Sequence, residues 1–71
     1  MDESLRIQEI DLIQVEDYIS FIKEYLEYAL IKEGVVIKKE DDFVFIQTDR
    51  NTVYKVRFLD ARFYKSALIK Q

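Results

Sequence analysis

The stretch from residue 12 to residue 33 constrains the fold most, because it is long, amphipathic and free of proline and glycine. Read with the period of a helix, it has one aliphatic band with spacings of three and four residues, which is typical of a core-facing helix. Asp11 is suited to cap the start of this helix, and Gly34 is suited to end it in a left-handed conformation. The sequence therefore predicts a helix over residues 12–33. The residues of the band are Leu12, Val15, Ile19, Ile22, Leu26, Ala29 and Leu30.

A strip of aromatic side chains lies beside the aliphatic band on this predicted helix. Band and strip together span about 200° of the helix surface, whereas one packed layer needs roughly 100°. The strip therefore requires a second cover, which is either another element of the same chain or another protein. Tyrosine suits an interface because it combines a large apolar body with a hydroxyl group that tolerates partial exposure. The strip consists of Tyr18, Phe21, Tyr25 and Tyr28.

After Gly34 the pattern changes from helical to extended. The segments 35–39, 43–48 and 52–59 are rich in β-branched and aromatic residues and are separated by short polar turns. This pattern predicts three strands in an antiparallel meander. The middle segment begins Phe-Val-Phe-Ile and is apolar on both faces, so we expect it to be covered on two sides.

Both ends of the chain allow alternatives. Asp60 can cap a short final helix over residues 61–69, unless the third strand continues through Phe63. Residues 1–10 are an irregular or helical lead-in, or else an edge strand. The predicted element order is α-β-β-β-α in a single domain, residues 1–71. We therefore expect an α+β fold, with a three-stranded antiparallel meander packed by a long N-terminal helix and a short C-terminal helix.

The composition excludes several kinds of chemistry. The chain has no cysteine and no histidine, which removes disulfides, thiolate nucleophiles, the usual zinc sites and the commonest general base near neutral pH. Its serines have no histidine to activate them, and there is no glycine-rich phosphate loop. The acidic run at residues 40–42 lacks the ligand pattern of a calcium loop. We therefore expect no enzyme activity, no cofactor and no metal site. No run of eighteen apolar residues is present, so we expect a cytoplasmic protein without membrane contact.

Charge is divided unevenly between the two halves of the chain. Residues 1–34 carry nine acidic and three basic residues, a net charge of −6, whereas residues 35–71 carry five acidic and eight basic residues, a net charge of +3. A basic face can contact phosphates, and the candidates here are Lys55, Arg57, Arg62 and Lys65. The simpler interpretation is a solvated face, because the net charge of −3 for the whole chain opposes nucleic-acid binding.

No motif in the sequence identifies a function. The leading hypothesis is non-catalytic protein binding, as a homodimer or as a small adaptor or inhibitor of a host or pathway protein. Its interface residues are those of the aromatic strip. The alternative hypothesis is a nucleic-acid-associated module that uses the four basic residues just named.

Overall fold

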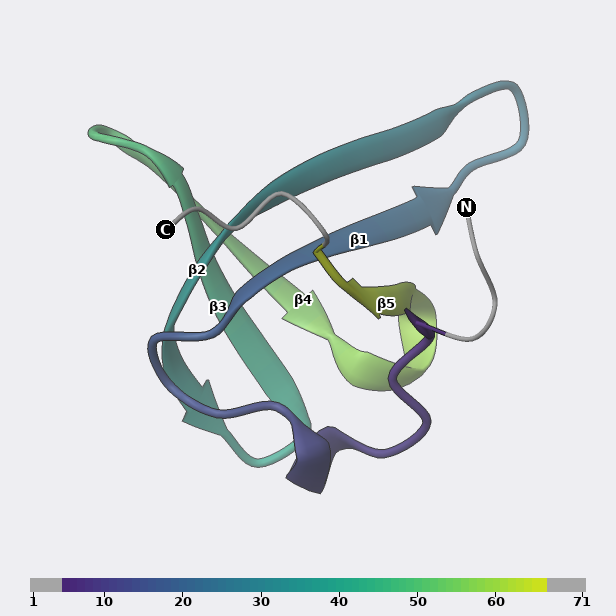
Figure 1. The fold of residues 1–71 in the computed structure, drawn as a ribbon. Helices are drawn as coiled ribbons and strands as arrows, with labels where there is room; N and C mark the ends of the chain where they lie inside the picture. Colours follow the sequence, from purple (N-terminus) through teal and green to yellow (C-terminus); the bar gives the residue numbers. More distant parts are fainter. Residues whose placement is uncertain (1–4, 67–71) are drawn as a thin grey trace.

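The computed structural model describes residues 5–66, which form a five-stranded antiparallel sheet. The spatial order of the strands is β4-β3-β2-β1-β5, so each strand pairs with its neighbour in sequence except β5, which returns to pair with β1 (Figure 1). Two short 3-10 helices complete the described elements. The elements are η2 (Ile10–Leu12), β1 (Tyr18–Glu24), β2 (Ala29–Glu40), β3 (Phe43–Asp49), β4 (Thr52–Arg57), η3 (Phe58–Asp60) and β5 (Arg62–Lys65).

The predicted α+β class is wrong, because the described residues form a sheet whose only helical elements are short 3-10 turns. The segment expected to be a helix over residues 12–33 instead contains β1, a hairpin loop and the start of β2. The final helix predicted over residues 61–69 is replaced by β5 as far as residue 65, and residues 67–69 lie outside the described part of the chain. The predicted strands 35–39 and 43–48 lie within β2 and β3, although β2 starts much earlier than predicted. The predicted strand 52–59 is too long, because β4 ends at Arg57 and residues 58 and 59 belong to η3.

The sequence of β1 explains why this segment is extended. Tyr18 to Ile22 reads Tyr-Ile-Ser-Phe-Ile, and β-branched and aromatic residues of this kind favour a pleated surface. Ile19 and Phe21 point to one face and are fully buried. Members of the supposed helical band, such as Leu12 and Leu26, are exposed instead. The helical spacing was therefore a coincidence of residues that belong to different elements.

Gly34 does not end a helix but lies inside β2, and its φ is not in the left-handed region. A Cβ atom at this position would be 2.2 Å from the carbonyl oxygen of Gln47 and 2.9 Å from the Cα atom of Thr48. Glycine is therefore required because the backbone of β3 passes too close for any side chain. The contact lies where β2 changes partners, since Val35 pairs with Tyr18 of β1 and also with Gln47 of β3.

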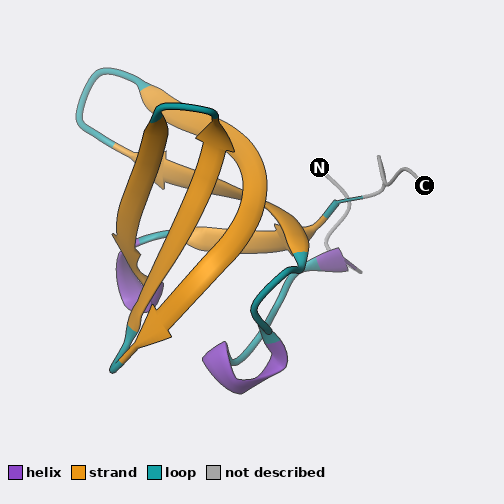
Figure 2. Cartoon of the chain, turned by 90° about the vertical axis from the view of Figure 1, so that its left-hand side faces the viewer, coloured by secondary structure: helices purple, strands orange, loops and turns teal. Residues whose placement is uncertain are grey.

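The sheet curls so that strands far apart in its order face each other. Residues 29–35 of β2 pair with β1 and residues 35–40 pair with β3, with a register shift between Val36 and Lys38. Such a shift bends a strand and increases its twist. Figure 2 shows the strongly curved sheet. The rings of Phe21 in β1 and Tyr54 in β4 consequently meet, with their centroids 5.7 Å apart, although β2 and β3 lie between the two strands in the order of the sheet.

The inside of the curl holds a single apolar core, and the N-terminal segment closes it. Ile7 and Ile13 are buried in this core, and the Ile7 N–H donates a hydrogen bond to the Phe63 carbonyl (2.7 Å). The expected lead-in is thus irregular, with one isolated β-bridge from Arg6 to Tyr64 and the turn η2. The core consists of Ile7, Ile13, Ile19, Phe21, Val36, Val44, Ile46, Val56 and Phe63.

Candidate functional site

The β1–β2 hairpin extends beyond the rest of the sheet and ends in a loop of four residues, Tyr25–Tyr28, which we call the aromatic tip (Figure 1). β5 pairs with β1 from Ile19 to Ile22, and β3 pairs with β2 from Val35 onward. The part of the hairpin nearest the loop is therefore a two-stranded ribbon. The Tyr25 N–H donates a hydrogen bond to the Tyr28 carbonyl (2.8 Å) and closes the loop.

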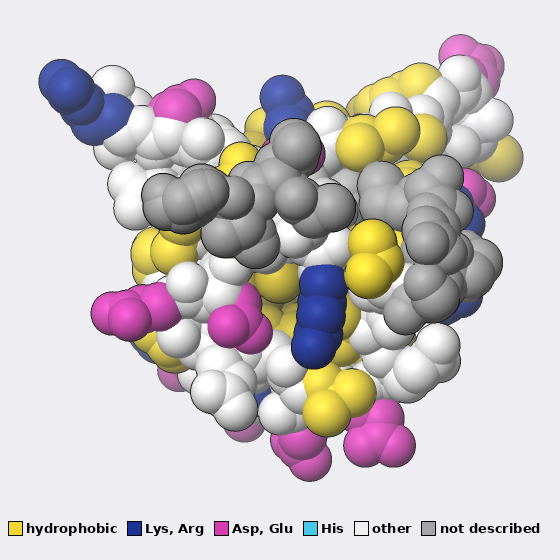
Figure 3. Space-filling view, in the orientation of Figure 1, with side chains coloured by type: hydrophobic (Ala, Val, Ile, Leu, Met, Phe, Trp, Pro, Cys, Tyr) yellow, Lys and Arg dark blue, Asp and Glu magenta, His cyan; other side chains and the backbone are white. Residues whose placement is uncertain are grey.

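The aromatic tip exposes a large apolar surface. The rings of Tyr25 and Tyr28 stack with their centroids 4.8 Å apart and their planes at 21°. Leu26 lies between them in sequence and is completely exposed, at 104% of its reference area. The Lys23 ammonium lies 5.6 Å from the Tyr25 ring centroid, which places a charge at the rim. Figure 3 shows hydrophobic side chains gathered along this projecting hairpin.

The structure brings together two of the four residues expected at an interface. Tyr25 and Tyr28 form the aromatic tip, whereas Tyr18 lies at the other end of β1. Phe21 is fully buried against Tyr54 and Phe63 in the core, so its ring is covered by the same chain. The sequence analysis missed Leu26 as an interface residue, because its helical spacing assigned it to the core.

Tyr18 has an electrostatic environment of its own. A hydrogen bond with the Glu33 side chain, together with partial burial and the charge of that carboxylate, raises the pKa of the Tyr18 phenol above its usual value. Its cross-strand partner is Val35, and both side chains remain partly exposed. Tyr18 thus remains a neutral hydrogen-bond donor on the outer face of the sheet at physiological pH.

The four basic residues proposed for nucleic-acid contact are divided between two strands. Lys55 and Arg57 lie two residues apart on β4, whereas Arg62 and Lys65 lie on β5. These two strands are at opposite ends of the strand order of the sheet. The Arg62 guanidinium forms an ion pair with the Glu24 carboxylate. The structure therefore does not gather the four residues into one row.

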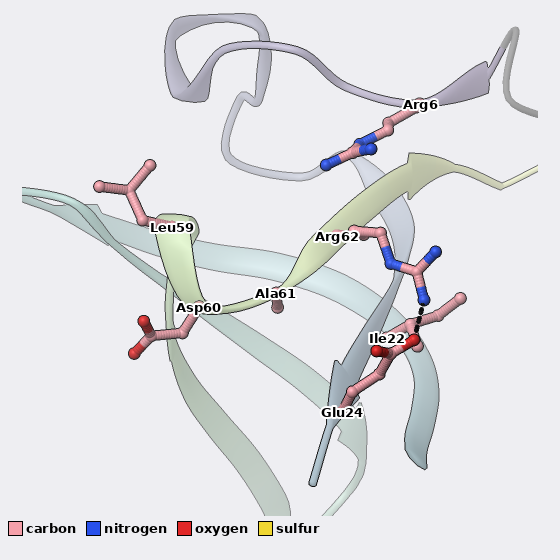
Figure 4. Close-up of a pocket in the computed structure, with 7 residues that line it drawn as sticks. All are labelled: Arg6, Ile22, Glu24, Leu59, Asp60, Ala61 and Arg62. Carbon is pink, nitrogen blue, oxygen red and sulfur yellow. Dashed lines mark hydrogen bonds and ion pairs between the residues drawn. The ribbon is translucent and has the colours of Figure 1, made fainter.

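A shallow cavity of about 220 Å³ lies between β1, η3 and β5 (Figure 4). Arg6 and Arg62 at its rim suit an anionic group, but Glu24 and Asp60 in the same wall oppose one. In Figure 4 the Arg62 side chain turns toward Glu24, and Asp60 points away from both. The cavity is therefore lined by both positive and negative side chains, and this mixture does not favour a ligand of either charge.

Two further observations concern the described part of the chain. No group of three or more carboxylates within residues 5–66 is placed to hold a metal ion. None of the helical elements in these residues has the length and apolar character needed to cross a membrane.

Comparison of the chain with protein-family models, curated proteins and solved structures found no match.

Proposed function

We propose that this protein is a non-catalytic protein-binding domain whose contact surface is the aromatic tip, with Leu26 as its anchor. The observation that carries the proposal is the complete exposure of Leu26 between two stacked tyrosines. Burying a leucine side chain contributes about 1.5–3 kcal/mol relative to leaving it in water. A partner that covers Leu26 recovers this free energy, and tyrosine is enriched at the energetic centre of interfaces.

The loop sequence supports the proposal. Tight turns are usually built from glycine, asparagine, aspartate, serine and proline, because these residues adopt or stabilise turn conformations. The aromatic tip reads Tyr-Leu-Glu-Tyr and contains none of them. Its residues therefore contribute little to forming the turn, which is consistent with a role in contacting another molecule.

The shape of the tip favours insertion into a partner. The hairpin projects from the sheet, so the tip is convex and suits a groove on the other protein. Lys23, Glu24 and Glu27 surround the apolar side chains and would form the polar rim that interfaces commonly have. The partner is a second copy of this chain or a different protein, and two experiments separate these cases.

Sedimentation equilibrium tests the homodimer. We expect a concentration-dependent increase in mass for the wild-type protein and its loss in Leu26→Asp. The matched control is Leu59→Asp, because Leu59 is also highly exposed but lies on η3, away from the aromatic tip. Equal loss of association in both variants would contradict a specific role for the tip.

Site-specific photocrosslinking tests a different partner. A photoreactive phenylalanine analogue at position 26, in protein expressed in its source organism, should give a discrete crosslinked protein. The same analogue at position 59 should not, and the crosslink should disappear in a Tyr25→Ala/Tyr28→Ala background. A monomeric wild-type protein whose position 26 gives only the products seen at position 59 would refute the proposal.

A further inference from the structure

The outer face of β3 carries a second aromatic surface, distinct from the aromatic tip. Val44 and Ile46 face the core and are fully buried. Phe43 and Phe45 alternate with them and therefore point to the opposite, solvent side of the sheet, where both are partly buried. This is the strand whose sequence predicts a cover on both faces.

Cationic side chains lie over both of these rings. The Lys55 ammonium is 4.5 Å from the Phe43 ring centroid and 5.8 Å from that of Phe45. Lys38 contributes an ammonium 5.2 Å from the Phe45 centroid, and Arg57 a guanidinium 4.6 Å from that of Phe43. These distances are those of cation–π contacts. We call the five side chains the aromatic–basic platform.

The strand register arranges the platform in two rows. Phe45 pairs with Lys38 of β2 on one side and with Lys55 of β4 on the other, which gives a row with one ring between two lysines. The next row consists of Glu40, Phe43 and Arg57 in the same strand order. The Phe45 row is therefore basic on both sides, whereas the Phe43 row has one charge of each sign.

Ion pairing distinguishes the three cations of the platform. Arg57 is held by Asp42 at 2.8 Å, and Lys38 lies 3.6 Å from Glu40 with both side chains well exposed. Lys55 forms no ion pair with any residue in the described range 5–66. Glu40 and Asp42 lie at or beside the β2–β3 turn, and Asp60 on η3 is a second acidic neighbour of Arg57 (3.9 Å). Lys55, which lies over both rings, is therefore the cation of the platform that these acidic groups leave unpaired.

We propose that the aromatic–basic platform binds single-stranded nucleic acid, with one base stacked on Phe45 and the adjacent phosphates at Lys38 and Lys55. Proteins that bind single strands combine aromatic rings, on which bases stack, with cations that follow the backbone. A neighbouring base stacks on Phe43. No element of the proposal depends on the aromatic tip, so either surface can fail its test without the other.

The spacing of the rings selects a single strand over a duplex. Phe43 and Phe45 are two residues apart on one strand, a separation of about 6.6–6.8 Å. Stacked bases in a duplex advance by about 3.4 Å per nucleotide. Successive bases can therefore occupy both rings only after they unstack, which a flexible single strand does readily. The net charge of −3 opposes binding, so complexes form at low ionic strength and weaken steeply with salt.

Fluorescence anisotropy with labelled oligothymidylate and oligouridylate of about twelve nucleotides tests the proposal. Saturable binding at low salt is expected. Phe45→Leu keeps an apolar residue but removes the stacking ring, so it should weaken binding by about tenfold or more. Lys55→Gln should reduce the slope of log affinity against log salt by about 0.7. Lys65→Gln removes the same charge from β5 and should change affinity less than about twofold.

Circular dichroism establishes whether each variant is folded, and the salt dependence of Lys55→Gln tests the proposal if Phe45→Leu does not fold. Absence of binding to both oligonucleotides at low salt would overturn the proposal. So would unchanged affinity in folded Phe45→Leu, equal effects of Lys55→Gln and Lys65→Gln, or equal affinity for a duplex of the same length. Competition by polyglutamate as strong as that by unlabelled oligonucleotide would assign the platform to acidic proteins and would equally overturn it.

Discussion

Replacing Gly34 with alanine tests the central packing feature of the fold. The added Cβ atom would lie 2.2 Å from the Gln47 carbonyl oxygen, 2.8 Å from its carbonyl carbon and 2.9 Å from the Thr48 Cα atom. All three atoms belong to the backbone, so no side-chain rotation relieves the overlap. β2 and β3 must separate at the point where β2 passes from one pairing partner to the other.

Opposing contributions set the magnitude of this effect. Overpacking a well-packed site costs about 1–3 kcal/mol, and weakening one hydrogen bond between the strands costs about 0.5–1.5 kcal/mol more. Alanine reduces the conformational entropy of the unfolded chain relative to glycine, and this effect alone stabilises the folded protein by about 0.4–1 kcal/mol. We expect Gly34→Ala to lower the free energy of unfolding by about 2–3 kcal/mol. In a domain of 71 residues this corresponds to a decrease in Tm of roughly 8–24 °C.

Urea denaturation followed by circular dichroism measures this loss. Ile31→Ala is the matched control, because Ile31 is an exposed position of the same strand and should change stability by less than about 1 kcal/mol. A Gly34→Ala protein as stable as the wild type would refute the close approach of β2 and β3. An increase in stability would have the same meaning, because only the effect on the unfolded chain would then remain.

Four further substitutions have defined outcomes. Glu16 has a φ of 84°, where a side chain is strained by about 1–2 kcal/mol, so Glu16→Gly should raise the free energy of unfolding by about 0.5–1 kcal/mol in urea titration. The Asn51 N–H donates a hydrogen bond to the Asp49 carboxylate (2.9 Å), and this bond, together with hydrogen bonds from Thr52, lowers the pKa of Asp49. The ionised carboxylate therefore stabilises the folded protein above the ordinary pKa of aspartate, and this stabilisation is lost as the pH falls through the lowered pKa. Asp49→Asn should therefore reduce the loss of stability in acid, measured as Tm against pH. Phe21→Ala should cost about 3–5 kcal/mol, whereas Tyr28→Ala should cost less than about 1 kcal/mol, as thermal denaturation would measure.

The end of β2 and strands β3 and β4 could be predicted from the sequence, because the two turns between these strands carry recognisable signals. Asp41 adopts a positive φ of 56° between β2 and β3, and aspartate tolerates this conformation better than most residues. In the next turn Asp49 accepts the backbone N–H of Asn51. Alternation of apolar residues in β3 then places Val44 and Ile46 inside. Local turn chemistry and local periodicity therefore agree with the fold in this region.

The N-terminal half was predicted wrongly for a specific reason. The hairpin loop between β1 and β2 contains no glycine, proline, asparagine or aspartate, so nothing in the sequence marks the reversal of the chain. Without that signal, two strands read as one continuous amphipathic segment. Gly34 added to the error. It is required because β3 passes close to it, which is a long-range property, but a lone glycine after an amphipathic segment is also typical of a helix C-terminus. β-branched and aromatic enrichment at Tyr18–Ile22 was the available evidence against a helix.

The candidate surfaces could likewise be predicted only in the parts that depend on the local sequence. Pairing of Phe45 with Lys38 and Lys55 depends on the register of three strands, which the sequence of any one strand does not contain. The apolar character of both faces of β3 was visible, but the cationic cover over the outer face required the register.

Both candidate surfaces are built on β2, and this sets a condition on how they can be tested. The first part of β2 forms one arm of the hairpin that carries the aromatic tip, and its last part carries Lys38 of the platform. Gly34 lies between them, where any added side chain separates β2 from β3. A substitution there should disturb both surfaces at once and cannot distinguish them. Leu26 and Lys55 lie outside this crossing, one at the hairpin loop and one on β4, so their variants report on one surface each.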